Sequence, residues 1–344
     1  MLATAVLLLE LAATSATSNA ALAGTRVVDR GGQRTWRAAG HASGSSAASS
    51  HPPSAGRSLT ASAPPCPVTN GQVDASQCGG GFDPTNATLA LRSALASGAH
   101  TVRVPAMGGR PWHIAPIPGV DPICPVDVKQ WGHCPALHLF NLTDLTLVLE
   151  PGAVLLAIRG AFRNPNADMI RVEQCRNLSI VGAGAALRMW REDIMAEPQQ
   201  YIHSENRGGL AVYDSSAVSI TGLNISHAGG DGIYMENVND TVVSAVNCHH
   251  NYRQAMSVVS ATNLLVEDSH FTDTNGTLPM CGVDLEPDWT FYRLVNISFK
   301  RCEFSRNANC GFVMNPYAIT SGYAKWVRNI PCLHVNVSVV SKTV

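Results

Sequence analysis

The 344-residue sequence has little charge and very little lysine. Asp, Glu, Lys and Arg make up 14% of the chain, against about a quarter in an average soluble protein. Lys supplies 4 of the 24 basic residues, and the formal net charge is −1. No Lys/Arg-rich run could follow a phosphate backbone, so nucleic acid is not an expected partner. The apolar fraction of 45% excludes a charge-rich disordered chain and can supply a large core.

Long apolar runs are absent beyond the N-terminus. Residues 3–13 are apolar apart from Glu10, and small-residue sites follow at Ser18-Asn19-Ala20 and Ala21-Leu22-Ala23. This predicts a signal peptide over residues 1–23, with a membrane-anchored start as the alternative because no basic residue precedes the run. No stretch reaches the roughly 20 apolar residues that span a bilayer. Residues 24–65 are rich in Ala, Ser and Gly without a hydrophobic period, which predicts a disordered spacer.

Zinc-ligand patterns are missing as well. None of the ten cysteines forms a CxxC motif and no His stands at ligand spacing beside a Cys pair, so a zinc site is not expected. Cys66/Cys78 and Cys124/Cys134 are close pairs in irregular segments, which predicts disulfides and a secreted protein. Eight Asn-x-Ser/Thr sequons agree with an extracellular glycoprotein, although such triplets also occur unmodified: Asn86, Asn141, Asn177, Asn224, Asn239, Asn275, Asn296 and Asn336.

A repeat of about 23 residues begins after residue 140. Gly232-Ile233-Tyr234-Met235 aligns with the segments that start at Ala255, Gly282 and Gly311. Two further apolar columns run in register, Ile220/Val243/Val266/Phe299 and Ile225/Cys248/Phe271/Phe304. Units of this length with short strands and period-2 alternation predict an all-β, right-handed parallel β-helix. A leucine-rich repeat would instead need a helical turn in every unit.

The repeat also sets the expected domain organisation. A helical stripe after Pro84 predicts a short capping helix over one sheet edge, which would protect that edge from further pairing. We expect an N-terminal cap and first strands over 66–140, coils over 141–317 and an irregular tail over 318–344. Cys281 and Cys310 fall in one column, one rung apart. A rung spacing of about 4.8 Å suits a disulfide between them.

The capping helix, the segment Leu149-Glu150-Pro151-Gly152-Ala153-Val154 and the coil around Gly230-Asp231-Gly232-Ile233 resemble the pectin-lyase-like superfamily over roughly residues 80–314. That superfamily includes polygalacturonase-like hydrolases, polysaccharide lyases, uronate epimerases and non-catalytic surface proteins. The resemblance therefore implies a carbohydrate-facing groove along one sheet, without fixing the reaction. Arg253-Gln254 stands where polygalacturonases have an Asp pair, and no Gly-His-Gly or Arg-Ile-Lys follows. Polygalacturonase activity itself is not expected.

The sharpest local feature is Asp284-Leu285-Glu286-Pro287-Asp288, which places three carboxylates on one strand face. Asp284 and Glu286 would stand about 6.6 Å apart on an exposed face, near the lower limit for an inverting glycosidase. Pro287 should end or bulge the strand. The alternatives are a solvated strand face and a calcium site formed by Asp284, Glu286 and Asp288.

Other polar residues fall around this run. Asp231 is a third catalytic candidate or a turn cap, and Tyr234 and Glu236 should face outward, where they could bind sugar. The same alternation predicts that Ser257 and Val259 are exposed. His227, His250 and Asp273 form one corner column, with His249 beside it, which could relay protons or consist of plain turn residues. Arg253 lies one rung below Asp284.

Three functions follow from these residues. The leading hypothesis is a secreted glycoside hydrolase with catalytic Asp284, Glu286 and Asp231, and with sugar-binding Tyr234, Glu236, His250, Arg253 and Asp288. The second is a Ca²⁺-dependent lyase or uronate epimerase in which Arg253 or His250 abstracts a proton. The third is a non-catalytic glycan-binding or surface protein. We expect a polysaccharide or other glycan as partner, a monomer, and no cofactor unless calcium is required.

Overall fold

The computed structural model describes residues 65–119, 124–127, 132–196 and 201–315, together with strands at 327–328 and 332–338. The predicted signal peptide lies outside these ranges, as does almost all of the predicted spacer. Both stay predictions. No helix in the described ranges is long and apolar enough to cross a membrane.

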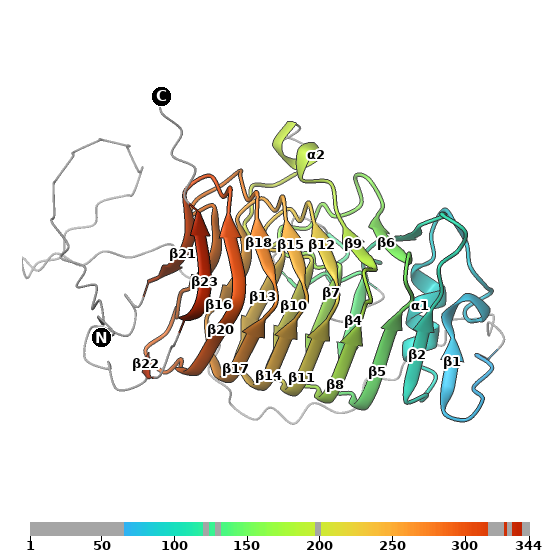
Figure 1. Cartoon of the computed structure of the whole chain (residues 1–344). Coiled ribbons are helices and arrows are strands. Elements are labelled where there is room, and N and C mark those ends of the chain that lie inside the picture. The colour runs from blue at the N-terminus through green and yellow to red at the C-terminus, as the bar shows by residue number, and fades with distance from the viewer. Residues whose placement is uncertain are drawn as a thin grey trace, which may run out of the picture. The chain divides into compact units, whose positions relative to one another are not determined.

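The described chain winds into stacked coils whose strands form two parallel sheets (Figure 1). The seven-stranded sheet has the order β21-β19-β16-β13-β10-β7-β4. Its strands are β4 Leu137–Phe140, β7 Ile170–Glu173, β10 Leu210–Tyr213, β13 Ile233–Glu236, β16 Gln254–Val258, β19 Cys281–Leu285 and β21 Cys310–Met314.

The sixteen-stranded sheet supplies the other two walls, because its path turns back through β20 Leu294–Ser305, which pairs with both β17 and β18. One wall contains β1 Gln72–Asp74, β2 Thr101–Val104, β5 Thr143–Leu149, β8 Arg176–Val181, β11 Ser216–Thr221, β14 Val238–Ser244 and β17 Ala261–Glu267. The other contains β3 Trp112–Ile114, β6 Val154–Ala157, β9 Ala186–Arg188, β12 Asn224–Ser226, β15 Asn247–His249 and β18 His270–Thr272.

The sequence register is confirmed rung by rung. Ile233 pairs with Met256, Met256 with Val283 and Val283 with Phe312. The columns Ile220/Val243/Val266/Phe299 and Ile225/Cys248/Phe271/Phe304 are likewise successive partners. The fold is therefore a parallel β-helix, as the repeat predicts.

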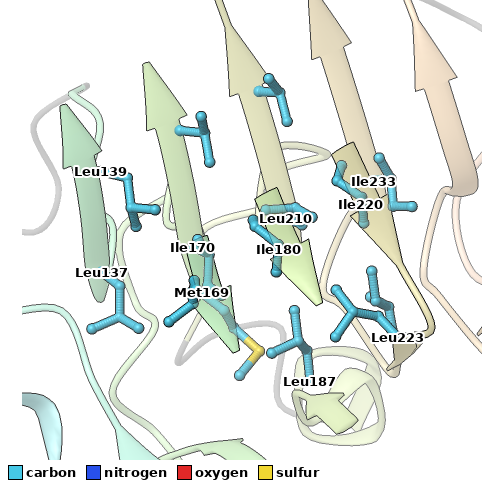
Figure 2. Close-up of a cluster of buried hydrophobic side chains, with 14 of the residues drawn as sticks. Leu137, Leu139, Met169, Ile170, Ile180, Leu187, Leu210, Ile220, Leu223 and Ile233 are labelled. Carbon is cyan, nitrogen blue, oxygen red and sulfur yellow. The ribbon is translucent and has the colours of Figure 1, made fainter. Parts of the chain in front are cut away.

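Aliphatic side chains from all three walls fill the interior, as the labelled leucines and isoleucines in Figure 2 show. Ile170, Leu210 and Ile233 stack along the inner face of the seven-stranded sheet and are fully buried. Each buried side chain of this kind contributes about 1.5–3 kcal/mol. Alternate residues on the same strands must then face outward.

Phe304 tests this register. Its ring is fully buried, 5.7 Å from Phe271 and 5.6 Å from Phe312 between ring centroids. We expect Phe304→Ala to lower the free energy of unfolding by about 3 kcal/mol, because it leaves a cavity between packed rungs. Urea denaturation measures the change. An unchanged midpoint would place Phe304 outside the core.

The coils turn at stacked corners in the left-handed backbone region. Asn141, Gln174, Asp214 and Asn237 follow successive strands of the seven-stranded sheet with φ of 53°, 55°, 45° and 54°. Asn and Asp tolerate this conformation better than most residues. Polar residues therefore mark the corners and leave the strands free for alternating side chains.

The N-terminal end carries the predicted capping helix, α1 Thr88–Leu95, after a 3₁₀ turn η1 at Ala75–Gln77. Asn86 Oδ1 accepts a hydrogen bond from the Thr88 backbone N–H at 3.1 Å, which satisfies one free donor of the first turn. The helix packs against β2, β3 and β4. A second helix, α2 Arg191–Ala196, interrupts the coil after β9.

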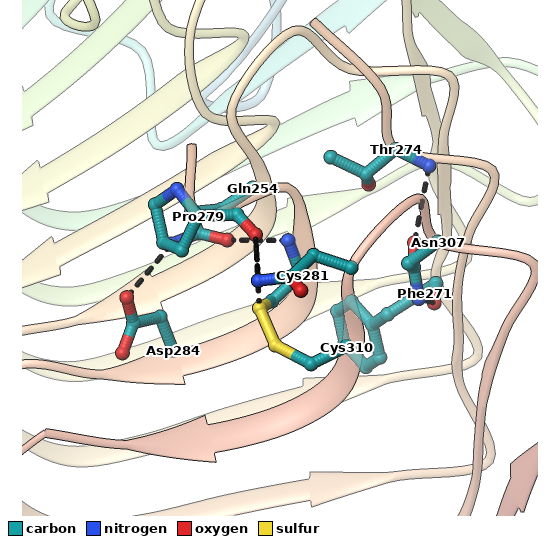
Figure 3. Close-up of a disulfide and its surroundings, with 9 residues drawn as sticks. Gln254, Phe271, Thr274, Pro279, Cys281, Asp284, Asn307 and Cys310 are labelled. Carbon is teal, nitrogen blue, oxygen red and sulfur yellow. Dashed lines mark hydrogen bonds between the residues drawn. A yellow bond between two sulfur atoms is a disulfide. The ribbon is translucent and has the colours of Figure 1, made fainter. Parts of the chain in front are cut away.

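At the other end, β22 Val327–Arg328 and β23 Cys332–Ser338 pair in parallel with β20. The ladder thus continues into the segment for which the sequence predicts an irregular tail. Disulfides join Cys66 to Cys78, Cys124 to Cys134 and Cys281 to Cys310. The last of these links β19 to β21 across one rung (Figure 3).

Candidate functional site

The outer face of the seven-stranded sheet brings most of the predicted site residues together. Tyr234, Ser257 and Asp284 are register partners on β13, β16 and β19. Ile233 and Met235 point into the core and Tyr234 and Glu236 point outward, as predicted from their alternation. β19 ends at Leu285, in agreement with the strand end expected at Pro287.

Arg253 lies immediately before β16 and joins carboxylates from three segments. Its Nη1 donates to Asp231 Oδ2 at 3.2 Å and its Nη2 donates to Glu286 Oε2 at 2.8 Å. Its Nε lies 3.2 Å from Glu205 Oε2. Burial alone would lower the pKa of Arg253, but the charges of Asp231, Glu205 and Glu286 outweigh burial and raise it. Arg253 is therefore a permanent cation that fixes these three acids.

Gln254, on the preceding rung, forms a hydrogen bond to Asp284, as Figure 3 shows. Gln254 Oε1 accepts from the Cys281 backbone N–H at 2.9 Å, so its amide nitrogen faces Asp284 and donates to Oδ2 at 2.7 Å. The other oxygen, Oδ1, finds no hydrogen-bond donor among the described residues. This arrangement leaves one side of a buried carboxyl group without a partner when it is ionised.

Asp284 and Glu286 form a carboxyl pair. Burial, together with the negative charge of Glu286 and a hydrogen bond to it, raises the pKa of Asp284 to about 7, against the opposing charge of Arg253. A proton on Asp284 thus completes a hydrogen bond between the two groups. Near pH 7 Asp284 is therefore about half protonated.

Two features of this pair differ from the sequence prediction. Asp284 is 1% exposed, whereas the sequence places it on an exposed face together with Glu286, whose side chain is 28% exposed. A direct hydrogen bond to Glu286 contributes to the raised pKa of Asp284, whereas the spacing predicted from the sequence holds the two carboxyl groups apart around a water. Ser257 and Val259, predicted to be exposed, are buried. Arg253 Nη1 lies 3.4 Å from Ser257 Oγ and covers this part of the sheet.

Asp231 is positioned by the glycines on either side of it. A Cβ at Gly230 would lie 2.1 Å from Glu205 O, and one at Gly232 would lie 2.2 Å from Cys248 Sγ. Only a residue without a side chain lets the chain pass so close. Burial raises the pKa of Asp231 to about 6, against the opposing charge of Arg253. Asp231 thus holds Arg253 and does more than end a turn.

Tyrosines line the sheet next to this cluster. Tyr234 and Tyr292 both donate hydrogen bonds to Glu236, and the Tyr213 and Tyr234 rings lie 5.3 Å apart. Asp288 lies near Tyr234 and Tyr292, and its charge contributes to raising the pKa of both phenols, for which burial is the main cause. Trp289 and Phe291 on the following loop are exposed and stacked at 6.2 Å.

A second polar group on β7 was not predicted. Arg171 Nε donates to Glu173 at 2.7 Å, its guanidinium lies 3.7 Å from the Tyr213 ring centre, and Asp168 lies 3.6 Å away. The rung pattern could have identified Arg171 and Glu173, because Ile170-Arg171-Val172-Glu173 alternates like residues 233–236. Nothing in the repeat marks Asp168, which lies just before the strand.

The predicted column of His227 and His250 is present, but His250 lines a hollow whose lining residues do not include Asp284 or Glu286. The His227 and His250 rings stack at 5.3 Å, and both residues occupy left-handed corners. Arg191, Asp273 and Arg306 lie with His250 around an open hollow of about 430 Å³. Burial lowers the pKa of His227 to about 4, so this ring is neutral at pH 7. The structure does not bring His250 to Asp284.

The calcium alternative requires three converging oxygen ligands. Within the ranges that the structure describes, no group of three His, Cys, Asp or Glu side chains is arranged to hold a metal ion. The charge of Asp288 acts on Tyr234, Glu286 accepts a hydrogen bond from Arg253, and Asp284 accepts one from Gln254.

The buried acid Asp284 should make stability depend on pH. Its folded-state pKa of about 7 exceeds the ordinary value of about 3.9, so the folded protein keeps a proton that the unfolded chain releases. This contribution is complete below about pH 4 and is lost as the pH rises through about 7. Asp284→Asn should therefore be more stable than wild type at pH 8, by on the order of 4 kcal/mol, and nearly equal to it at pH 4. Urea denaturation at both pH values measures this, and a pH-independent difference would contradict it.

Comparisons with known proteins identify the fold and leave the reaction open. A family model described as "Right handed beta helix region" matches residues 200–323. Together with the parallel ladders, this makes the fold a right-handed parallel β-helix, as predicted. No curated protein matches the chain.

Several solved structures are similar to this chain at low identity. A candidate glycosyl hydrolase from Parabacteroides merdae is 14% identical, with a TM-score of 0.47, over 68% of this chain and 97% of its own. The surface adhesin PfbA of Streptococcus pneumoniae is 12% identical, with a TM-score of 0.43, over 76% and 61%. The periplasmic alginate epimerase AlgG is 10% identical, with a TM-score of 0.35, over 69% and 50%. Similarity this low carries no information about the reaction of this chain.

Proposed function

We propose that this protein is a secreted glycoside hydrolase that acts on a polysaccharide with the carboxyl pair Asp284/Glu286. The observation that carries the proposal is a buried carboxyl group with a pKa of about 7, hydrogen-bonded to a partly exposed carboxylate. A general acid for glycosidic cleavage needs a raised pKa and contact with the substrate. Asp284 supplies the first property and Glu286 supplies the second.

The reaction follows from the different roles of Asp284, which holds the proton, and Glu286, which reaches the substrate. Glu286 presents the shared proton to the leaving glycosidic oxygen while the C–O bond breaks, which leaves both carboxyl groups of the pair negatively charged. That charge, together with Asp231, faces the positive charge that develops on the sugar ring. The pair then takes a proton from the water that adds to the ring, which restores the starting state. Arg253 positions both Glu286 and Asp231 throughout, since it binds each of them.

The substrate would lie across the strands of the seven-stranded sheet. Tyr234, Glu236 and Asp288 continue the polar face next to Asp284. Exposed Trp289 and Phe291 offer apolar ring faces at one side. Flat aromatic surfaces beside hydrogen-bonding groups suit a sugar, which has both apolar and hydroxyl faces.

The Ca²⁺-dependent lyase or epimerase is supported less well. Arg253, one of its candidate bases, is surrounded by three carboxylates that raise its pKa, so it cannot release a proton readily. His250, the other candidate, lines the separate hollow with Arg191 and Arg306. Secretion of the protein is supported by the three disulfides, which form in oxidising compartments.

Product analysis on a panel of polysaccharides tests the proposal. Hydrolysis yields new reducing ends without ultraviolet absorbance from unsaturated uronates, and it persists in EDTA. Unsaturated products that require Ca²⁺ would instead assign a lyase, and changed uronate configuration without cleavage would assign an epimerase. Glycan binding without any product would assign a non-catalytic protein.

A further inference from the structure

A small hollow next to the proposed catalytic pair lies between two buried carboxyl groups. Asp168, Gly208 and Asp231 occupy one column on three successive rungs, since the backbone N–H of Met169 donates to Gly208 O and that of Gly209 donates to Asp231 O. The two acids are thus two rungs apart, about 9.6 Å at a 4.8 Å strand spacing. The hollow between them is lined as well by Glu205, Asn206, Tyr213 and Tyr234.

Gly208 keeps this hollow open. A Cβ at this position would lie 2.6 Å from Asp168 Oδ1, and the glycine backbone N–H donates to that oxygen at 3.3 Å. The free volume is about 10 Å³, close to the 10–15 Å³ that one water molecule needs. The space therefore admits a group of one or two heavy atoms and no whole sugar ring.

Each of the two acids has one buried carboxyl oxygen that accepts no hydrogen bond from the described residues. The side chains of Asp168 and Asp231 are 4% and 5% exposed, and Asp168 Oδ2 and Asp231 Oδ1 have no hydrogen-bond donor among the described residues. Arg171 lies 3.6 Å from Asp168 Oδ2, which is too long for a hydrogen bond. Buried oxygens without donors are costly and call for an N–H or O–H group.

The charges around the hollow select a neutral donor. An anionic group would meet Asp168, Asp231 and Glu205, and would be repelled by like charges. A cationic group would find each buried acid already beside a guanidinium, Arg171 for Asp168 and Arg253 for Asp231. Each free oxygen lacks a hydrogen-bond donor, and the proton of an uncharged hydroxyl supplies one to Asp168 without adding charge.

We propose that the hollow at Gly208 binds one hydroxyl group of the glycan and thereby selects neutral sugars over uronates. Asp168 accepts a hydrogen bond from this hydroxyl, Asp231 lines the other side of the hollow, and Gly208 provides the space for the group. This inference rests on the proposed function, because it places the same glycan chain on the same sheet. It narrows the substrate to polysaccharides that carry a hydroxyl or hydroxymethyl group where a uronate carries a carboxylate.

Binding to matched glycans tests the inference in an E286Q background, which prevents turnover. The probes are immobilised oligoglucosides and oligoglucuronates of equal length and linkage, with oligomannosides and oligomannuronates as a second pair. We expect neutral members to bind at least tenfold more tightly than their uronates. Asp168→Asn should weaken neutral binding about tenfold and narrow this preference, because charged acceptors form the stronger hydrogen bonds.

Glu173→Gln is the matched control, since it also removes a carboxylate beside Arg171 but does not line the hollow. It should keep both affinities. Gly208→Ala should abolish neutral binding, and the isosteric Asp168→Asn covers the case in which Gly208→Ala fails to fold. Tighter uronate binding, or equal effects of Asp168→Asn and Glu173→Gln, would overturn the inference and leave the proposed function standing. Absence of any glycan binding would overturn both.

Discussion

Replacing Glu286 by Gln should lower turnover of the true substrate by about 10²–10⁴-fold, the usual contribution of a general acid. The amide cannot carry the shared proton to the leaving oxygen, although it keeps the size of the side chain. Asp284→Asn should cause a loss of similar size, because it removes the buried group that holds the proton at neutral pH. Initial rates of reducing-end formation under substrate saturation measure both variants.

Asp288→Asn is the internal control for this prediction. The charge of Asp288 acts on Tyr234 and Tyr292 in the proposed sugar-binding face, so its loss should mainly weaken binding. Circular dichroism and glycan affinity should remain close to wild type in the two amide variants. If both variants keep full turnover, the carboxyl pair is structural and catalysis occurs elsewhere.

Arg253→Gln should lower the free energy of unfolding by about 3–5 kcal/mol at pH 7, because it leaves buried acids without their cation. The largest effect should fall on Asp231, whose raised pKa is restrained chiefly by this guanidinium. The pKa of Asp231 should rise further, so the loss of stability should shrink toward pH 4, where Asp231 is neutral. Turnover should fall as well, since Glu286 loses the group that positions it.

Arg301→Gln provides the matched comparison. Arg301 also bridges two carboxylates, Asp268 and Glu267, but its side chain is 54% exposed. An exposed pair of this kind contributes at most about 1 kcal/mol. Urea denaturation of the two variants side by side measures the difference. Equal losses would show that Arg253 acts as an ordinary surface charge.

The sequence predicts the coil register because packing repeats. Ile233, Met256 and Val283 occupy equivalent positions in successive rungs, so period and alternation alone place them inside and their neighbours outside. Cys281 and Cys310 follow from the same register. The C-terminal strands were not predicted, although β22 and β23 follow β20 at the same offset of 33 residues by which β20 follows β17.

The site is predictable only in part. The alternation of residues along a strand predicts which side of the sheet a side chain faces, but it does not predict whether neighbouring side chains cover it. Asp284 does face away from the core, but Arg253 and Gln254 close over it, and no strand pattern encodes that cover. His250 shares a column with corner residues and is separated from Asp284 by the turn that leads into β16. Asp168 lies before its strand, where the repeat carries no information, and the pairing with Asp231 across Gly208 appears only when the rungs are stacked.

The most direct test of the account is the protonation state of Asp284 in the resting protein. Carbon-13 NMR of the side-chain carboxyl groups, with Asp284→Asn to assign the signal, follows the titration of the pair. We expect Asp284 to lose its proton near pH 7. A carboxyl signal for Asp284 that titrates near its ordinary value, about pH 4, would show an ionised group at neutral pH and would contradict the proposed acid.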